Sequence, residues 1–126
     1  MSTKQSEPTP VQAAQEAGWT DYWNKEGVGG EVFVGPQNQR HEKLGVFWRE
    51  MLGDLADNTR LLDVACGAGS VFAALPPGHT LELYGTDVSD QALKLLKSRI
   101  GAVKCSKASA TELPYPDEHF GMVVSQ

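Results

Sequence analysis

The chain has 126 residues, of which 40% are hydrophobic and 21% are charged, a composition typical of a globular domain. Its net charge of −5, with no basic stripe, argues against a nucleic-acid partner. No apolar stretch approaches the roughly 18 residues of a membrane span, and the polar N-terminus does not resemble a signal peptide, so we expect a cytoplasmic protein without a membrane partner.

Residues 1–59 are predicted to form a tail and a helical extension. Residues 1–10 are polar and rich in Pro, Ser and Thr, which is typical of a loose tail, and Thr9-Pro10 can start a short helix over 11–17. Three aromatic residues follow that either pack on the main core or close a ligand pocket, and the sequence leaves both readings open: Trp19, Tyr22 and Trp23. Residues 27–39 are rich in glycine and predict a loop.

An amphipathic helix is predicted next, capped by Asn38 or Gln39 and ended by Asp57-Asn58. Six apolar residues recur along it with helical spacing and are expected to pack in the core: Leu44, Phe47, Trp48, Met51, Leu52 and Leu55.

From residue 60 the pattern alternates between strands and helices. We expect strands over 61–65, 81–87, 102–106 and 120–125, and a helical segment over 70–75. A longer helix follows the second strand, with Ser89 as its N-cap and Gly101 ending it. This order predicts an α/β fold with a parallel sheet.

The predicted sheet places a glycine turn and two acids at one edge. The first strand carries Asp63 and runs directly into Cys66-Gly67-Ala68-Gly69, and Asp87 ends the second strand 24 positions after Asp63. Ligands of open parallel sheets bind beyond the carboxyl ends of the strands, where a carboxylate such as Asp87 can accept both hydroxyls of a ribose. The pattern predicts a nucleotide-like ligand; the alternative is a tight turn beside an acid that only caps the next helix.

Two common nucleotide motifs do not fit. A dinucleotide fingerprint would need a third glycine where this chain has Phe72, and no phosphate-binding loop with a Gly-Lys-Ser/Thr ending occurs. A polar turn after the third strand, residues 108–111, is placed to contact an adenine edge.

Three segments resemble the motifs of class I S-adenosylmethionine-dependent methyltransferases: 62–69 (Leu-Asp-Val-Ala-Cys-Gly-Ala-Gly), 85–89 (Gly-Thr-Asp-Val-Ser) and 109–125. The resemblance covers residues 60–126, about half of the chain, and corresponds to the N-terminal half of that family's domain. It implies a Rossmann-like class I methyltransferase fold, truncated after the fourth strand, with an N-terminal helical extension over 1–59.

The resemblance also implies S-adenosyl-L-methionine as the cofactor. In the family's layout Asp63 and the turn bound the methionine end, Asp87 binds the ribose, and the remaining residues lie around the adenine. The residues that it assigns to cofactor binding are Asp63, Ala65, Gly67, Gly69, Asp87, Val88, Ser109, Ala110 and Thr111. This chain departs from the family's usual pattern at three positions. The family usually has glycine where this chain has Ala65, and often has aspartate where this chain has Ser109 and Gly121.

The function implied is methyl transfer to a small-molecule acceptor, and we name no catalytic base and no metal. The three histidines, His41, His79 and His119, are interpreted as surface or loop residues, and Cys66 and Cys105 as small buried thiols.

Two alternative functions remain open. One is a non-catalytic fragment or interaction module that at most binds the cofactor, and the other is a nicotinamide-dependent oxidoreductase. Because the fourth strand would be an apolar edge, a partner chain or homo-oligomer is expected to cover it.

Overall fold

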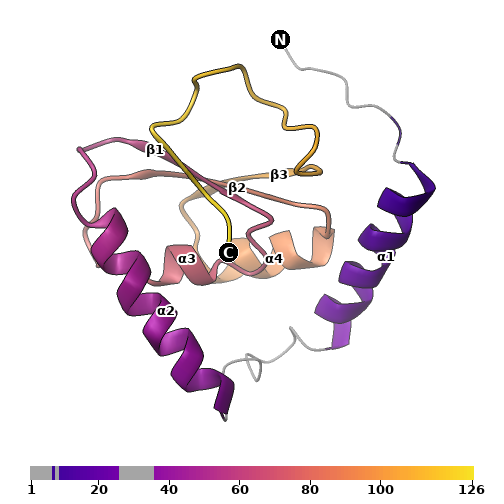
Figure 1. The fold of residues 1–126 in the computed structure, drawn as a ribbon, viewed down its shortest axis with the longest axis horizontal. Helices are drawn as coiled ribbons and strands as arrows, with labels where there is room; N and C mark the ends of the chain where they lie inside the picture. The colour runs from indigo at the N-terminus through magenta and orange to yellow at the C-terminus, as the bar shows by residue number, and fades with distance from the viewer. Residues whose placement is uncertain (1–6, 8, 26–35) are drawn as a thin grey trace.

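The computed structural model describes residues 7, 9–25 and 36–126. Most of the predicted tail, and the glycine-rich loop as far as residue 35, lie outside the described residues, as do the side chains of Tyr22 and Trp23. Figure 1 shows the elements, which in chain order are α1 (Pro10–Lys25), α2 (Pro36–Leu52), β1 (Arg60–Val64), α3 (Ser70–Ala73), β2 (Glu82–Asp87), α4 (Asp90–Arg99), β3 (Val103–Lys107) and β4 (Met122–Val124).

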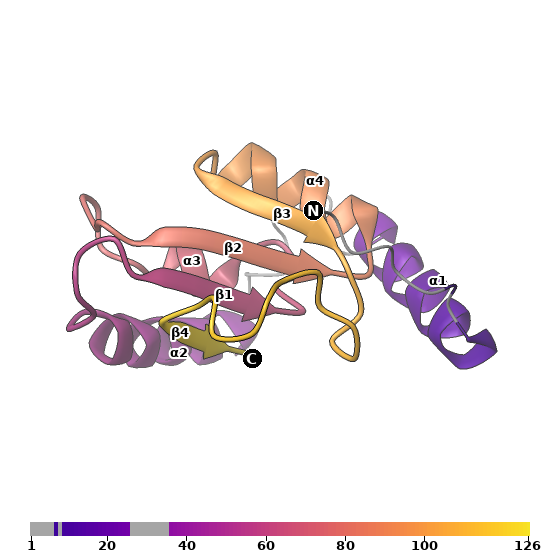
Figure 2. The ribbon, with the colours of Figure 1, turned by 90° about the horizontal axis from the view of Figure 1, so that it is seen from above.

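Four parallel strands form one sheet in the order β3-β2-β1-β4 (Figure 2). Leu62 of β1 is level with Tyr84 of β2 and with Val123 of β4. The α/β prediction is confirmed, and every strand lies within two residues of its predicted position. Because all four strands run the same way, their carboxyl ends meet at one edge of the sheet.

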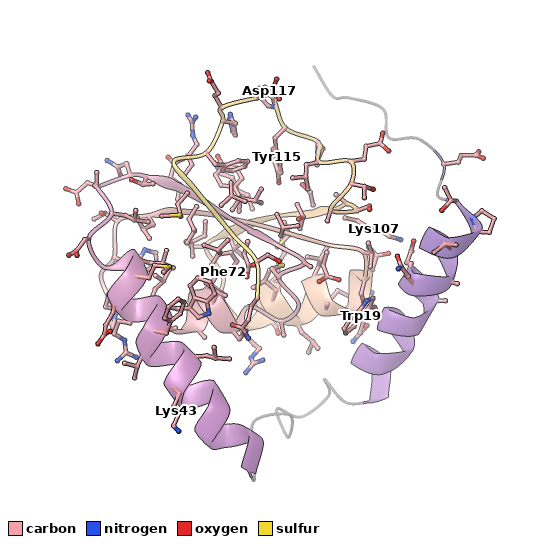
Figure 3. All side chains as sticks on the ribbon, in the orientation of Figure 1. Trp19, Lys43, Phe72, Lys107, Tyr115 and Asp117 are labelled. Carbon is pink, nitrogen blue, oxygen red and sulfur yellow. The ribbon has the colours of Figure 1, made fainter. Side chains whose placement is uncertain are left out.

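The two faces of the sheet are covered differently. Helices α2, α3 and α4 lie on one face, and the connection from β3 to β4 crosses the other, so Phe72 and Tyr115 are on opposite sides of the strands (Figures 1 and 3). The apolar core includes Trp48 and Leu52 of α2 beside Leu61 of β1. Helix α2 thus packs into the same core as the sheet, and a domain boundary at residue 59 stays a prediction.

Both N-terminal helices begin at a proline. Proline is favoured at the first helical position because its fixed φ suits the helix and its missing N–H group would have no partner there. The prediction of a loop over residues 36–39 is therefore wrong, as is an N-cap at Asn38 or Gln39, since α2 starts at Pro36. Helix α1 starts at Pro10 and continues past the predicted end at residue 17.

Helix α2 ends at Leu52, before the predicted end at Asp57-Asn58. The next residue, Gly53, is a poor helix former, and a Cβ atom there would lie 2.8 Å from the carbonyl oxygen of Arg49. The chain consequently turns five residues earlier than the hydrophobic pattern indicates.

The apolar stripe of α2 is only partly buried. Trp48 and Leu52 lie in the core, and Leu44 and Leu55 pack against it, with Leu55 already beyond the helix. Phe47 and Met51 remain 47% and 48% exposed, so the prediction that the whole stripe packs in the core is wrong for these two residues. They lie at the margin of the stripe, outside the part of α2 that packs in the core.

Helix α4 follows its predicted capping pattern. The backbone N–H group of Ala92 donates to the Ser89 hydroxyl at 3.3 Å, and Ser89 is extended, as an N-cap residue should be. Ala92, Leu93 and Leu96 are buried against the sheet, and Gly101 follows the C-cap residue Ile100. The cap fixes the chain direction immediately after Asp87.

Gly85 of β2 lets the helical layer approach the sheet. A Cβ atom at Gly85 would lie 2.9 Å from the Sγ atom of Cys66, 3.2 Å from Leu96 and 3.3 Å from Phe72. In a dinucleotide-binding fold, a glycine on the helix allows the helix and the strand to pack closely. In this chain the helix carries Phe72 instead, and the glycine that allows close packing is Gly85 on the neighbouring strand β2.

Gly85→Ala is expected to lower the free energy of unfolding by about 1–3 kcal/mol, because an added methyl group would overpack this contact. Urea denaturation would measure the effect. Gly101→Ala is the matched control, since a Cβ atom there meets nothing within 4 Å and should change stability by less than about 0.5 kcal/mol. Equal losses in the two variants would contradict the packing argument.

Strand β4 forms one edge of the described sheet, paired with β1. Val123 on it is 54% exposed. An apolar, exposed edge favours pairing with another strand, and its coverage by a partner chain or a second copy stays a prediction.

Candidate cofactor-binding site

The turn after β1 is built from left-handed residues. Ala65, Gly67 and Gly69 have φ angles of 57°, 55° and 89°. Glycine adopts this conformation freely, whereas for alanine it costs about 1–2 kcal/mol, so Ala65 introduces local strain into the turn. A Cβ atom at Gly69 would lie 2.4 Å from Leu96, so this glycine also permits the contact between the turn and α4.

Asp87 connects the end of β2 to this turn. Its Oδ2 atom accepts a hydrogen bond from the backbone N–H group of Gly67, and its Oδ1 atom accepts one from that of Ser89, both at 2.9 Å. The side chain is 7% exposed. Each carboxylate oxygen keeps a further lone pair, so the carboxylate is held rigidly at the carboxyl edge with acceptor capacity to spare.

Asp63 is a buried carboxylate beside the turn. It is 2% exposed, and among the described residues its Oδ1 atom has no hydrogen-bond partner. Burial, and secondarily the negative charge of Asp87, raise the pKa of Asp63 from 3.8 to about 7. A buried acceptor without a donor is costly in a native protein. The Oδ1 atom of Asp63 is therefore suited to accept a hydrogen bond from a cationic or donating group of a ligand.

The polar turn after β3 is attached to the end of β2. The backbone N–H group of Ala108 donates to the carbonyl oxygen of Asp87 at 3.0 Å. In this turn the hydroxyls of Ser109 and Thr111 are hydrogen-bonded to each other at 2.8 Å, and the N–H group of Thr111 donates to Ser109 at 3.3 Å. The Ser109 hydroxyl is thus already engaged, Ala110 is exposed, and the half-buried Val88 lies between the end of β2 and Ser89, the N-cap residue of α4.

The predicted residues fall into two groups. Asp63, Gly67 and Asp87 are brought together by hydrogen bonding and by the electrostatic contact of the two acids. The residues from 109 to 111 lie beyond them at the end of β3 and follow Ala108, whose backbone N–H group donates to the carbonyl oxygen of Asp87. All of them are at the carboxyl edge, where parallel sheets bind ligands.

A ring cluster that sequence reasoning missed holds the β3–β4 connection on the sheet. Tyr115, His119 and Phe120 pack on Tyr84 of β2 with ring centroids 5.0–6.0 Å apart, and the Tyr115 hydroxyl donates to the Ser106 hydroxyl at 3.5 Å. His119 is in a loop, as predicted, but its ring stacks on Tyr115. The signal was the close spacing of three rings after residue 114.

A cavity of about 630 Å³ lies next to the turn, among α2, α3 and the end of α4. Its walls include Trp48, Arg49, Gly69 and Ile100, but neither Asp63 nor Asp87. The cavity therefore belongs to the helical layer and is distinct from the edge at which Asp87 lies.

The described part of the chain shows neither a metal-ligand cluster nor a membrane-spanning helix. Within residues 7, 9–25 and 36–126, no three His, Cys, Asp or Glu side chains are placed to hold a metal ion. No helix in those same ranges has the length and apolar character needed to cross a bilayer. A metal-free site and a cytoplasmic location stay predictions.

Comparison with known proteins identifies the family. The model described as "Methyltransferase domain" matches residues 62–126, slightly more than half of the chain. The demethylmenaquinone methyltransferase of Geobacillus kaustophilus is 36% identical over 95 residues, which cover 68% of this chain and 39% of the relative. The ubiquinone/menaquinone biosynthesis C-methyltransferase UbiE of Ectopseudomonas mendocina is 35% identical over 81 residues, covering 57% and 31%. The chain spans about a third of the length of these relatives.

Solved structures agree on the fold. Geranyl diphosphate C-methyltransferase from Streptomyces coelicolor A3(2), solved with S-adenosyl-L-homocysteine, superposes with a TM-score of 0.69 at 14% identity, over 95% of this chain and 55% of that one. The [4+2]-cyclase SpnF superposes with a TM-score of 0.67 at 22% identity, over 96% and 50%. The chain belongs to the methyltransferase-domain family, within the class I S-adenosylmethionine-dependent methyltransferases.

Proposed function

We propose that this chain binds S-adenosyl-L-methionine at the carboxyl edge of its sheet and forms the cofactor-binding portion of an enzyme that methylates a small-molecule acceptor. The observation that carries the proposal is Asp63, a buried carboxylate whose Oδ1 atom lacks a partner among the described residues. The methionine end of the cofactor carries an ammonium group and a sulfonium, and either charge suits such an acceptor. The residues present therefore fit the cofactor.

Each predicted residue has a role in this proposal. Asp63 holds the cationic end, and the backbone of the turn at Ala65, Gly67 and Gly69 lies against the methionine portion. Asp87, already fixed by two N–H groups, uses its remaining lone pairs for the ribose hydroxyls. The adenine lies between Val88 and the turn formed by Ser109, Ala110 and Thr111.

When bound, the cofactor would supply an electrophilic methyl group on a positively charged sulfur, which a nucleophile of the acceptor takes up as the carbon–sulfur bond breaks and S-adenosylhomocysteine leaves. The chain contributes orientation: a rigid turn, a fixed carboxylate at the ribose and a buried carboxylate at the cationic end hold the donor in one position. Holding donor and acceptor in line supplies much of the rate of such a displacement.

The acceptor is proposed to be a small organic molecule, in keeping with the similar proteins, which include a C-methyltransferase of ubiquinone/menaquinone biosynthesis and a geranyl diphosphate C-methyltransferase. An alternative is a module that binds the cofactor without transferring its methyl group. The alternative is favoured by the fact that every role assigned above concerns the cofactor and none concerns the acceptor. The same fold also occurs in a protein named as a cyclase, so the fold alone does not decide the reaction.

Calorimetric titration with S-adenosylhomocysteine tests the proposal. We expect saturable binding of one molecule per chain, and an absence of binding to the folded chain would refute the proposal. Incubation with methyl-labelled S-adenosylmethionine and candidate quinone precursors then separates the two alternatives, because label appears in the acceptor only if the chain catalyses transfer.

A further inference from the structure

The turn after β3 carries two hydroxyl groups that are hydrogen-bonded to each other. The Oγ atom of Ser109 lies 2.8 Å from the Oγ1 atom of Thr111, and either hydroxyl can be the donor. The backbone N–H group of Thr111 also donates to the Ser109 hydroxyl, at 3.3 Å. The Ser109 side chain is therefore held in place, while the direction of its hydrogen bond to Thr111 is reversible.

The Ser109 hydroxyl can offer a ligand either an acceptor or a donor. A hydroxyl has one proton and two lone pairs, and its proton rotates to suit its neighbours. When Ser109 donates to Thr111, one lone pair is left beside the one that accepts the N–H group, so Ser109 can accept a hydrogen bond from a ligand. When Thr111 donates to Ser109, both lone pairs are occupied, and the Ser109 proton is left to donate.

Ser109 lies close to the proposed ribose site. Lys107, two residues before it, is the register partner of Asp87, and neighbouring strands of a sheet are about 4.8 Å apart. The backbone N–H group of Ala108 donates to the carbonyl oxygen of Asp87, which keeps the turn against the end of β2. A base that extends from a ribose at Asp87 across the end of β3 therefore meets Ser109.

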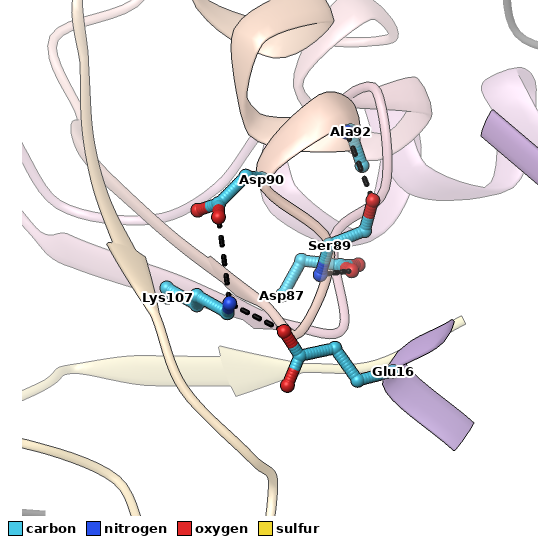
Figure 4. Close-up of polar contacts among 6 residues, drawn as sticks. All are labelled: Glu16, Asp87, Ser89, Asp90, Ala92 and Lys107. Carbon is cyan, nitrogen blue, oxygen red and sulfur yellow. Dashed lines mark hydrogen bonds and ion pairs between the residues drawn. The ribbon is translucent and has the colours of Figure 1, made fainter. Parts of the chain in front are cut away.

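The charged side chain at the end of β3 is engaged by acids of the helices. The Lys107 Nζ atom forms an ion pair with Oε1 of Glu16 on α1 and lies 3.4 Å from Oδ2 of Asp90 on α4 (Figure 4). The turn that follows, residues 108–111, contains no charged residue. Recognition of a base by this turn therefore depends on hydroxyl and backbone groups.

We propose that Ser109 lets the cofactor site accept a purine with either an amino or a keto group, so that S-inosyl compounds bind as S-adenosyl compounds do. The inference rests on the proposed function, since it concerns the base of the same cofactor. The amino group of adenine donates to Ser109 in its accepting state, and the keto oxygen of hypoxanthine accepts from Ser109 in its donating state. A carboxylate at this position would favour the amino group, because it has no proton to donate.

Calorimetric titration with S-adenosylhomocysteine and with S-inosylhomocysteine measures the ratio of the two dissociation constants. We expect the unaltered chain to bind both, with constants within about tenfold of each other, since one neutral hydrogen bond contributes at most about that factor. Ser109→Asp should raise the preference for S-adenosylhomocysteine at least about tenfold over that of the unaltered chain. Ser109→Asn is the matched control, because its amide has the size of the aspartate side chain but can both donate and accept, so its ratio should stay that of the unaltered chain.

Adenine and hypoxanthine also differ at the ring nitrogen beside the amino or keto group, but that difference is common to all the variants and cancels when their ratios are compared. Binding of S-adenosylhomocysteine without detectable binding of S-inosylhomocysteine to the unaltered chain would overturn the proposal, as would equal ratios in the Ser109→Asp and Ser109→Asn chains. Glu112→Gln, which removes the acid next to the turn, should leave the ratio unchanged, and a changed ratio would assign base recognition to that acid instead of Ser109. If the unaltered chain binds neither compound, it is the proposed function that fails.

Discussion

Asp87→Asn is expected to weaken the binding of S-adenosylhomocysteine at least about tenfold. The carboxylate has lone pairs left for two ribose hydroxyls after accepting N–H bonds from Gly67 and Ser89. Hydrogen bonds to a charged group contribute roughly 1.5–3 kcal/mol each, and 1.4 kcal/mol corresponds to a factor of ten in affinity. Isothermal titration calorimetry would measure the dissociation constants.

Asparagine is preferred to alanine for this test because it keeps one oxygen as an acceptor for a backbone N–H group. Asp117→Asn, in the exposed part of the β3–β4 connection, is the control for loss of one negative charge. Circular dichroism and urea denaturation would show that the variants remain folded. An unaltered dissociation constant in a folded Asp87→Asn chain would remove Asp87 from the ribose site.

Asp63→Asn is expected to stabilise the cofactor-free chain at pH 8 and to have little effect at pH 4. The pKa of Asp63 is raised from 3.8 to about 7, so between these values the folded chain holds a proton that the unfolded chain has lost. Stability therefore falls as the pH rises from about 4 to about 7 and is level above. The full difference corresponds to at most about 4 kcal/mol, which urea denaturation at the two pH values would measure. A gain of the same size at both pH values would contradict the assignment.

Because the pKa of Asp63 is raised, we expect cofactor binding to release a proton from this carboxyl group. A cationic cofactor stabilises the ionised form of Asp63, so binding of S-adenosylmethionine near pH 6.5 should release up to about one proton. Calorimetry in two buffers of different ionisation enthalpy measures that release. Asp63→Asn should abolish it, and release that persists in this variant would assign the proton to another group.

Features with local causes could be predicted from the sequence. The four strands and the Ser89 cap depend on periodicity and on contacts within four residues, and the parallel sheet was expected from the alternation of strands and helices; all are confirmed. Helix limits were less accurate, because Pro36 and Gly53 outweigh the hydrophobic stripe of α2.

Contacts between distant segments could not be predicted. The hydrogen bond from the Gly67 backbone to Asp87, and the space that Gly85 leaves for Phe72, depend on how β1 and β2 are aligned, which no local pattern specifies. The attachment of Glu16 to Lys107 joins residues 91 positions apart. The family motifs located Asp63 and Asp87, but only the fold indicates that the Oδ1 atom of Asp63 has no hydrogen-bond partner among the described residues and that Asp87 already accepts two hydrogen bonds.

The pairing of β1 with β4 has a consequence for the order of folding. Leu62 is level with Val123, so β1 gains this neighbour only when segments about 60 residues apart meet. Closing a loop of that length costs entropy before any contact compensates it, and parallel sheets with such long-range pairs fold slowly. During synthesis β1 and β2 can pair as soon as they emerge, but the free side of β1 stays without its neighbour until residues 122–124 have left the ribosome. That interval is when the chain is most exposed to association with other chains.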